Sequence, residues 1–304
     1  MSDFMIISSS LLASIKTVCC CTCPQNSHKV GWHEQDPIEI WQNVRHCVNA
    51  VHDKLQLTHK IKAIGITNQR ETLIAWNSRT GMPYYNAIVW DDLRTTCTAQ
   101  QIASEAPVSF MVTGSSSSFS DATTAPSDRL RAKTGLPLAS YFSGTKLRWL
   151  IENVSQLRSD LTSASERDHV MFGTIDTWLV YNLTGSSIAV GHVANIGGIH
   201  VTDVTNASRW LLMDLYQCQW DTHLIQIVCG AHKNPVVPLG SLPIIKSSSE
   251  VYGICAVGCG IKALEKVPIA SILGDQQAAL FGQAGFNRGD AKVGITQCVA
   301  LVLF

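Results

Sequence analysis

The stretch VPIASILG at residues 267–274 constrains the fold of this chain more than any other feature. It is a continuous apolar run of strand length, and the segment DQQAALFGQ, which predicts a helix rich in small residues, follows it without a linker. A strand with no polar alternation is buried on both faces, so helices must cover its sheet. The run therefore predicts an α/β fold with Asp275 at the carboxyl end of a buried strand, where open α/β sheets bind ligands.

The elements that precede this run also alternate between helix and strand. Asp36 is placed to cap a helix that begins with Pro37, with Glu39 positioned to close a capping box, and apolar residues then recur at helical spacing to Leu55. Three further strands are expected, the last two joined by the turn SRTGMP: residues 61–66, 72–77 and 86–90. Helix, strand and hairpin in this order favour a mixed α/β sheet.

Two more helices and one long loop are expected in the middle of the chain. Thr145 is expected to cap a helix whose apolar face lies within residues 147–154. The segment IDTWLVYNLTG predicts another helix, which Gly185 ends. Residues 103–133 are rich in Ser, Thr, Ala and Pro and lack periodicity, which predicts a surface loop or insertion.

Composition and charge exclude several classes of protein. A chain of 304 residues, 46% apolar and 15% charged, has the composition of a globular protein with two domains or one large α/β unit. The 23 basic and 23 acidic residues balance, so nothing in the charge calls for a nucleic-acid partner. No apolar run reaches the roughly 18 residues that a membrane span requires.

The first 29 residues differ from the rest and are expected to be poorly ordered. Asp3 stands where a secretory signal would carry positive charge. The cluster from Cys19 to Cys23 holds four of the 11 cysteines and contains a C-x2-C spacing, which His28 and His33 could complete as a zinc site. Palmitoylation and unpaired, reduced thiols are the alternatives, and reduced thiols fit a chain long enough to build its own core.

Two polar clusters follow apolar elements. Arg70 and Glu71 come after the expected strand at 61–66, and such a pair can donate to and accept from the hydroxyl groups of a polyhydroxy compound. A surface ion pair on a turn is the alternative. Asp275 and Gln276 begin the helix after the apolar run, where a helix-capping aspartate competes with a role in a polar ligand crevice.

Two aromatic residues are further candidates. Tyr141 precedes the helix at 147–154 and could close over a small ligand, or it could simply pack there. Trp90 ends an expected strand and, on residue type alone, is expected in the core. The sequence holds no phosphate-binding P-loop, dinucleotide-binding glycine motif or H-E-x-x-H zinc motif. The residues alone predict an α/β protein with a polar crevice near Asp275.

Several segments, in order along the chain, resemble the glycerol kinases of the sugar-kinase superfamily, which has the actin and hexokinase ATPase fold. The most specific are ITNQRET, YFSGTK and GDQQAALFGQ, and the resemblance extends from about residue 30 to about residue 292. It implies a ribonuclease-H-like first domain at residues 30–286, lacking its opening strands and carrying the insertion at 103–133. Residues 287–304 would begin a truncated second domain, and residues 1–29 have no counterpart.

The resemblance also implies roles for individual side chains in binding glycerol. Arg70 and Glu71 match the pair that holds the glycerol hydroxyls. Trp90 matches the aromatic residue that lies against the carbon chain, which reverses the expectation of a core residue. Tyr141 matches a tyrosine that donates to a glycerol hydroxyl.

The implied reaction is the transfer of a phosphoryl group from ATP, with Mg²⁺, to glycerol, giving sn-glycerol 3-phosphate and ADP. Asp275 matches the catalytic base, and Gln276 matches its neighbour in the glycerol site. The resemblance further implies a cytoplasmic protein and leaves mitochondrial association and a homo-oligomer open. No metal-binding residue is identified.

The nucleotide half of the family's site has little counterpart. The first phosphate-binding hairpin of the family is missing from residues 1–29. In the second, only Thr296 is retained as a nucleotide contact, because Ile295 and Gln297 replace glycines that allow close approach to a phosphate. Val299 stands where a phenylalanine closes the glycerol pocket.

The chain also stops inside an apolar strand at residues 298–304, which predicts an incomplete chain. We therefore expect a truncated glycerol kinase with little or no turnover, because phosphate and metal contacts are the main catalytic contributions. The alternative is a non-catalytic glycerol-binding or regulatory paralogue.

Overall fold

The fold centres on a five-stranded sheet with strand order β1-β13-β3-β12-β11. The computed structural model describes residues 3–8, 29–55, 61–105, 130–186, 195–231, 233–291 and 298–303. The strands of this sheet are β1 (Asp3–Ser8), β13 (Cys298–Leu303), β3 (Ile64–Asn68), β12 (Pro268–Gly274) and β11 (Gly253–Ile254). β3 and β12 are parallel neighbours, whereas β13 runs antiparallel to β3 and β11 antiparallel to β12.

A second, antiparallel sheet lies beside the first, with strand order β2-β5-β4-β6. Its strands are β2 (Glu34–Gln35), β5 (Ala87–Ile88), β4 (Leu73–Asn77) and β6 (Val170–Thr174). Two small ribbons complete the strands: β7 (Val201–Asp203) with β10 (Ile244–Lys246), and β8 (Met213–Asp214) with β9 (Gln219–Trp220).

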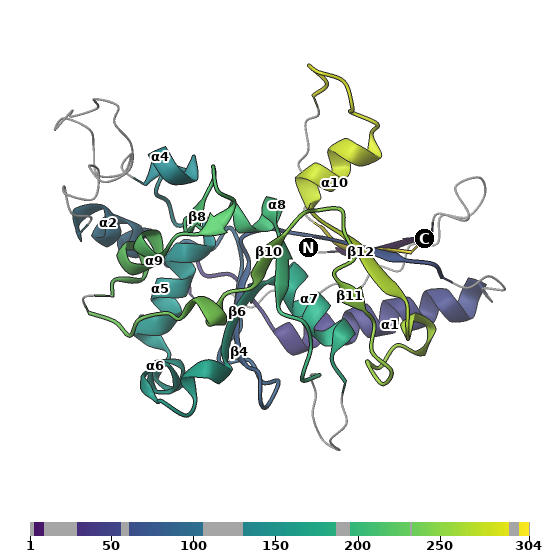
Figure 1. Cartoon of the computed structure of the whole chain (residues 1–304), viewed down its shortest axis with the longest axis horizontal. Coiled ribbons are helices and arrows are strands. Elements are labelled where there is room, and N and C mark those ends of the chain that lie inside the picture. The colour runs from purple at the N-terminus through teal and green to yellow at the C-terminus, as the bar shows by residue number, and fades with distance from the viewer. Residues whose placement is uncertain are drawn as a thin grey trace.

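Helices surround both sheets (Figure 1). The α-helices are α1 (Pro37–Leu55), α2 (Thr96–Glu105), α4 (Arg131–Thr134), α5 (Ser143–Asn153), α6 (Ser155–Thr162), α7 (Ile175–Thr184), α8 (Val204–Ala207), α9 (Thr222–Cys229) and α10 (Asp275–Gly282). Short 3₁₀ turns are η3 (Arg167–His169), η4 (Leu239–Ser241) and η5 (Lys262–Leu264). Within the described residues, no helix is both long and apolar enough to cross a membrane.

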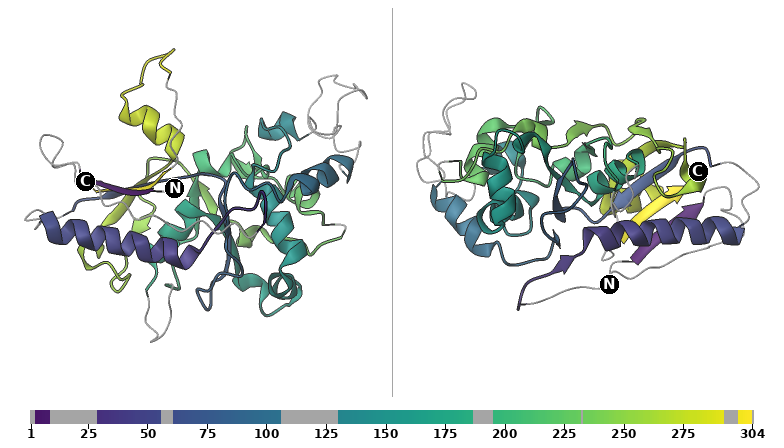
Figure 2. Two further views of the ribbon diagram at one scale, coloured as in Figure 1. Left: turned by 180° about the vertical axis from the view of Figure 1, so that it is seen from behind. Right: turned by 90° about the horizontal axis from the view of Figure 1, so that it is seen from below.

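Two apolar cores hold these layers together. In the first, α1 and α7 pack on the five-stranded sheet, with Trp41, Trp178 and Ile272 fully buried among their neighbours. Figure 2 shows α1 running along one face of that sheet. In the second core, α5 and α9 cover the antiparallel sheet through residues such as Leu147 and Phe172. Burial of each large apolar side chain stabilises the fold by roughly 1.5–3 kcal/mol.

Local signals in the sequence place two helices as expected. The Asp36 carboxylate accepts a hydrogen bond of 2.8 Å from the Ile38 N–H, so α1 begins at Pro37. Gly185 ends α7, and its N–H donates to the Tyr181 carbonyl at 2.9 Å. The helix after the apolar run is also confirmed as α10.

The helix around Thr145 begins earlier than the capping pattern predicts. α5 starts at Ser143, and the Thr145 hydroxyl instead donates back to the Phe142 carbonyl at 2.9 Å inside the first turn. Tertiary contacts determine this start: the Ser143 hydroxyl donates to the Glu71 carbonyl at 3.2 Å, and Gly144 packs against the Trp210 main chain. The expectation that Thr145 is the cap was wrong.

Three expected ranges differ from the structure. The predicted loop at 103–133 is helical at both ends, because α2 continues to Glu105 and α4 begins at Arg131; residues 106–129 lie outside the described residues. Residues 3–8 form β1 at the sheet edge, although we expected residues 1–29 to be poorly ordered. Residues 298–303, expected to begin a second domain, pair with β3 in the first sheet.

Candidate active site

The parallel pairing of β3 and β12 brings two predicted site segments to one edge of the sheet. Gly274, the last residue of β12, is in register with Asn68, the last residue of β3. The Arg70 side chain then lies directly against Gly274: a Cβ added to that glycine would be 2.3 Å from Arg70 Cδ. Arg70 and the helix start at Asp275 therefore meet at the carboxyl ends of neighbouring strands, where such sheets bind ligands.

Glu71 has a buried carboxylate in an unusual backbone conformation. Its φ is +63°, and the Thr72 N–H donates to the Arg70 carbonyl at 2.8 Å across it, closing a tight turn between the two sheets. The side chain is 2% exposed, and its Oε1 accepts a hydrogen bond of 2.5 Å from Arg209 Nε. The Glu71 carboxylate is therefore buried and paired with Arg209, whereas the alternative interpretation was a surface ion pair between Glu71 and Arg70.

Arg70 makes few contacts within the protein. Its Nη1 is 3.5 Å from the Thr205 carbonyl oxygen, and its buried Nε finds no acceptor within the described residues. Since buried donors are normally satisfied, this guanidinium has capacity left for an oxygen ligand.

Tyr141 and Trp90 form an aromatic wall next to these charges. Their ring centroids lie 5.5 Å apart in an edge-to-face arrangement, and both residues are only partly buried, so Trp90 is not a core residue. Burial raises the pKa of Tyr141; the charges of Glu71, Arg209, Arg70 and Asp275 also act on it, and the two carboxylates raise it further. Tyr141 is thus within electrostatic reach of all four charged groups.

Asp275 is the first residue of α10, and Gln276 is the second. The Asp275 Oδ1 accepts a hydrogen bond of 2.8 Å from the Gln276 N–H. The unpaired N–H groups at a helix N-terminus interact favourably with a carboxylate, so this contact fixes the position of the Asp275 side chain. The preceding residue, Gly274, donates its N–H to the Thr205 hydroxyl at 2.8 Å, which anchors the end of β12.

These side chains together suit a small polyhydroxy ligand. A guanidinium and a tyrosine hydroxyl can donate, two carboxylates can accept, and an aromatic wall can lie against carbon. The structure brings together residues that are far apart in the sequence, as the site prediction requires: Arg70, Glu71, Trp90, Tyr141 and Asp275 with its neighbour Gln276.

Comparison with known proteins decides the family. Residues 12–282 match the N-terminal domain of the FGGY family of carbohydrate kinases. The chain belongs to this family. The match begins at residue 12, inside the segment for which the sequence indicated no counterpart.

Curated relatives of this FGGY kinase domain include glycerol kinases. The chain is 44% identical over 265 residues to a glycerol kinase of Clavibacter michiganensis, covering 87% of this chain and 44% of that protein. For a glycerol kinase of Brucella anthropi the identity is 45%, with 87% of this chain and 45% of that protein covered. The chain therefore spans about half the length of the curated relatives it matches.

Solved structures confirm the predicted fold class. A Plasmodium falciparum glycerol kinase with ADP superimposes with a TM-score of 0.72 at 32% identity, covering 95% of this chain and 51% of that one. A Lactobacillus acidophilus xylulose kinase gives 0.64 at 20% identity, with 92% and 49% covered, and supports the fold alone. The FGGY domain thus has the first-domain fold of the actin-like sugar kinases.

Two basic residues of this FGGY domain's site were missed at the sequence level. Arg209 pairs with Glu71, and no local pattern signals a contact between residues 138 positions apart. Lys146 is fully buried beneath Tyr141, and here a signal existed. It lies four residues before Leu150 on the apolar face of α5, where a lysine is out of place unless it has a polar task.

The nucleotide half of the site cannot be built from the described residues. Thr296, the predicted nucleotide contact, lies outside them, as do its neighbours Ile295 and Gln297. Nor does the described part of the chain hold a group of three or more His, Cys, Asp or Glu side chains that could bind a metal ion. The cluster from Cys19 to Cys23, with His28, also lies outside the described residues.

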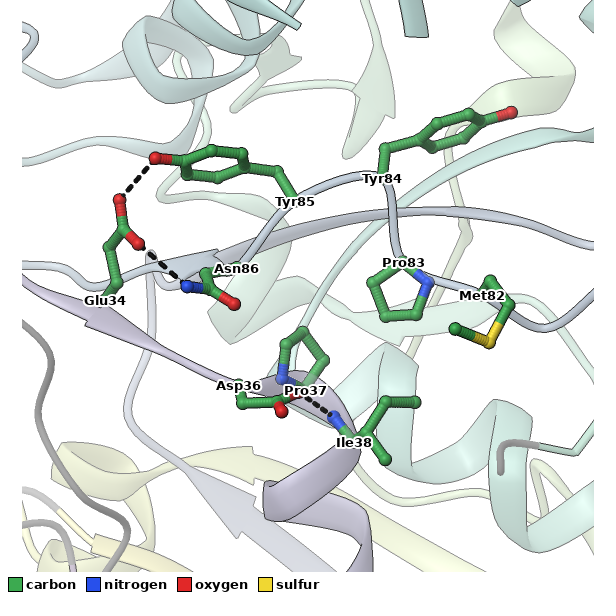
Figure 3. Close-up of a pocket in the computed structure, with 9 residues that line it drawn as sticks. All are labelled: Glu34, Asp36, Pro37, Ile38, Met82, Pro83, Tyr84, Tyr85 and Asn86. Atoms are coloured by element: carbon green, nitrogen blue, oxygen red, sulfur yellow. Dashed lines mark hydrogen bonds between the residues drawn. The ribbon is translucent and has the colours of Figure 1, made fainter. Parts of the chain in front are cut away.

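A cavity of about 440 Å³ lies elsewhere on the domain (Figure 3). Its lining residues are Glu34, Asp36, Pro37, Ile38, Met82, Pro83, Tyr84, Tyr85 and Asn86. The buried Glu34 carboxylate accepts from the Tyr85 hydroxyl at 2.7 Å and from the Asn86 amide at 2.9 Å. None of the six residues predicted to bind the substrate lines this cavity. The Glu34 carboxylate is already satisfied by hydrogen bonds from protein donors.

Proposed function

We propose that this chain is the glycerol-binding domain of an ATP-dependent glycerol kinase. The observation that carries the proposal is the convergence of Arg70, Glu71 and Tyr141 on the strand end that leads into Asp275. The identity of 44% to a curated glycerol kinase supports glycerol over larger polyols as the acceptor. The proposed reaction converts glycerol and ATP to sn-glycerol 3-phosphate and ADP.

Each side chain has a proposed task in holding glycerol. Arg70 donates to glycerol oxygens, and Glu71, held by Arg209, accepts hydrogen bonds from glycerol hydroxyls. Tyr141 donates from its hydroxyl, and the Trp90 ring lies against the carbon chain. Gln276 contributes an amide next to Asp275.

Asp275 is proposed as the base. It accepts the proton of the terminal hydroxyl as that oxygen attacks the γ-phosphorus of ATP; the bond from the γ-phosphorus to the β–γ bridging oxygen breaks, and ADP leaves. Phosphoryl transfer depends mainly on positioning, so a carboxylate fixed at the start of α10 suits this role.

The sequence at residues 294–299 favours a second candidate, glycerol binding without turnover. The resemblance implies that Ile295 and Gln297 stand where the family's phosphate hairpin has glycines. Side chains at these positions would keep the backbone away from a phosphate. We therefore propose that glycerol binding is retained and that phosphoryl transfer by this chain is weak. A cytoplasmic location, with mitochondrial association as the alternative, and a homo-oligomer are proposed only by analogy with the family.

Calorimetry with the 304-residue chain tests the binding half of the proposal. Glycerol is expected to bind without nucleotide, xylulose and gluconate are expected not to displace it, and Arg70→Met should weaken binding at least tenfold. Absence of glycerol binding at millimolar concentrations would overturn the proposal. A coupled assay then separates the candidates: ATP-dependent formation of sn-glycerol 3-phosphate indicates a working kinase, and binding without it favours the second candidate.

A further inference from the structure

Lys146 is a fully buried lysine whose described partners are all main-chain carbonyl oxygens. It lies in the first turn of α5 with no exposed surface. Its Nζ donates to the carbonyl oxygen of Tyr141 at 2.5 Å, of Ser140 at 3.0 Å and of Trp90 at 3.4 Å. Two of these three carbonyls belong to the two residues of the aromatic wall.

The chemistry of an ammonium group matches this arrangement. A protonated lysine has three N–H donors and no acceptor, so three carbonyls use it completely. The Trp90 carbonyl comes from the segment after β5, whereas Ser140 and Tyr141 precede α5. The amine therefore joins two chain segments at the position where their side chains form the wall.

We propose that Lys146 is a positioning residue for glycerol: its ammonium fixes the main chain of Trp90 and Tyr141 so that their rings form one wall. This inference rests on the proposed function. A role in packing alone does not explain the residue type, because a buried amine has a desolvation cost that methionine of similar length avoids.

Burial makes the protonation of Lys146 sensitive near neutral pH. Burial lowers the pKa of Lys146 to about 7, the negative charges of Glu71, Asp92 and Asp91 oppose this, and Arg94 adds to the lowering. Above that pH the amine loses one donor and presents a lone pair to carbonyl oxygens. We therefore expect the wall to loosen, and glycerol affinity to fall, as the pH rises through about 7.

Calorimetric titration with glycerol from pH 6 to pH 8.5 tests this role. The wild-type dissociation constant should rise at least fivefold over this range. Lys146→Met should weaken binding at least tenfold at pH 6 and remove the pH dependence. Lys233→Met, at an exposed lysine paired with Glu105, is the matched control and should follow the wild type. A folded Lys146→Met variant with wild-type affinity and pH profile overturns the proposal.

A second measurement needs neither glycerol nor a folded Lys146 variant. The difference between the fluorescence spectra of the wild type and of Trp90→Phe reports the surroundings of Trp90. This difference spectrum should shift with a midpoint near pH 7, and a spectrum that does not change across that range overturns the Lys146 inference. Failure of the wild type to bind glycerol at every pH overturns the proposed function and the glycerol role of Lys146 with it.

Discussion

At Glu71 the backbone has a left-handed φ of +63°, a conformation that side chains other than glycine rarely adopt. The surroundings compensate for this cost, of order 1 kcal/mol or more. The carboxylate pairs with Arg209, and the Glu71 carbonyl accepts from Ser143. Strain retained at a buried, paired carboxylate marks a position where geometry matters more than local stability. We therefore expect glycerol binding by Glu71 to depend on its partners Arg209 and Ser143.

The contribution of Arg209 to glycerol binding can be tested by removing its guanidinium group. In Arg209→Met the buried Glu71 carboxylate loses its partner, and glycerol affinity should fall at least tenfold, which corresponds to about 1.4 kcal/mol or more. Arg209→Lys should lose less, because it keeps the charge without the same geometry. Titration calorimetry measures both variants. Unchanged affinity in folded Arg209→Met protein would show that the ion pair has no part in binding.

The absence of a side chain at Gly274 is a second requirement at the residue scale. A Cβ there would be 2.3 Å from Arg70 Cδ, so Gly274→Ala should displace Arg70 and weaken glycerol binding about tenfold or more. At Gly282, at the other end of α10, such a Cβ would have no described atom within 4 Å apart from its chain neighbours and its own helix backbone, so Gly282→Ala is a matched control. Equal glycerol affinities in the two variants, measured by calorimetry, would contradict the placement of Arg70.

At the scale of elements, the sequence predicted those helix ends that contacts between nearby residues determine. Asp36 and Gly185 set the bounds of α1 and α7 through contacts within four residues, and both were predictable. The start of α5 was not, because Ser143 and Gly144 are held by segments distant in the sequence. The same reason applies to the candidate site: motifs suggested its candidate residues, but Arg209 pairs with Glu71 across 138 positions and carries no local pattern.

Thr205 of the short helix α8 holds the end of β12 by a hydrogen bond, which predicts an effect on the free energy of unfolding. The Thr205 hydroxyl donates to Asp203 Oδ2 at 2.7 Å and accepts from the Gly274 N–H at 2.8 Å. Thr205→Val leaves the Gly274 N–H unsatisfied next to Asp275, so the free energy of unfolding should fall by about 1–3 kcal/mol. Urea denaturation measures the free energy of unfolding, and Thr96→Val, at an exposed hydroxyl in α2, is the control. Equal decreases in the two variants would show that the hydrogen bond between Thr205 and Gly274 contributes no more than an exposed one.

At the scale of the whole molecule, two layers of sheet and helix place the site where they join. The turn at Arg70 and Glu71 connects β3 of one sheet to β4 of the other, and α10 leaves the first sheet at the same edge (Figure 1). Stability of the whole fold and integrity of the site are therefore linked. The acid sensitivity of the buried core tests how firmly the layers are joined.

His200 provides that test because its partly buried ring packs against Trp76, with 5.4 Å between the ring centroids. Burial lowers the pKa of His200 to about 4, and its Nε2–H donates to the Phe172 carbonyl oxygen at 2.8 Å. Since the folded-state pKa lies below the unfolded value of about 6.5, this contribution is fully present above pH 6.5 and is lost as the pH falls toward 4, up to about 3 kcal/mol.

Urea denaturation at pH 7 and pH 5 of the wild type and His200→Gln isolates this contribution. Asp176 acts with the opposite sign, because burial raises its pKa to about 7 and its contribution falls as the pH rises toward 7. It is present in both proteins and cancels in their difference. The wild type should therefore lose about 2 kcal/mol more than His200→Gln between pH 7 and pH 5, since a histidine with a folded-state pKa of about 4 takes up a proton on unfolding at pH 5. Equal losses in the two proteins would mean that His200 is accessible to protons in the folded state, and that the layers around it separate readily.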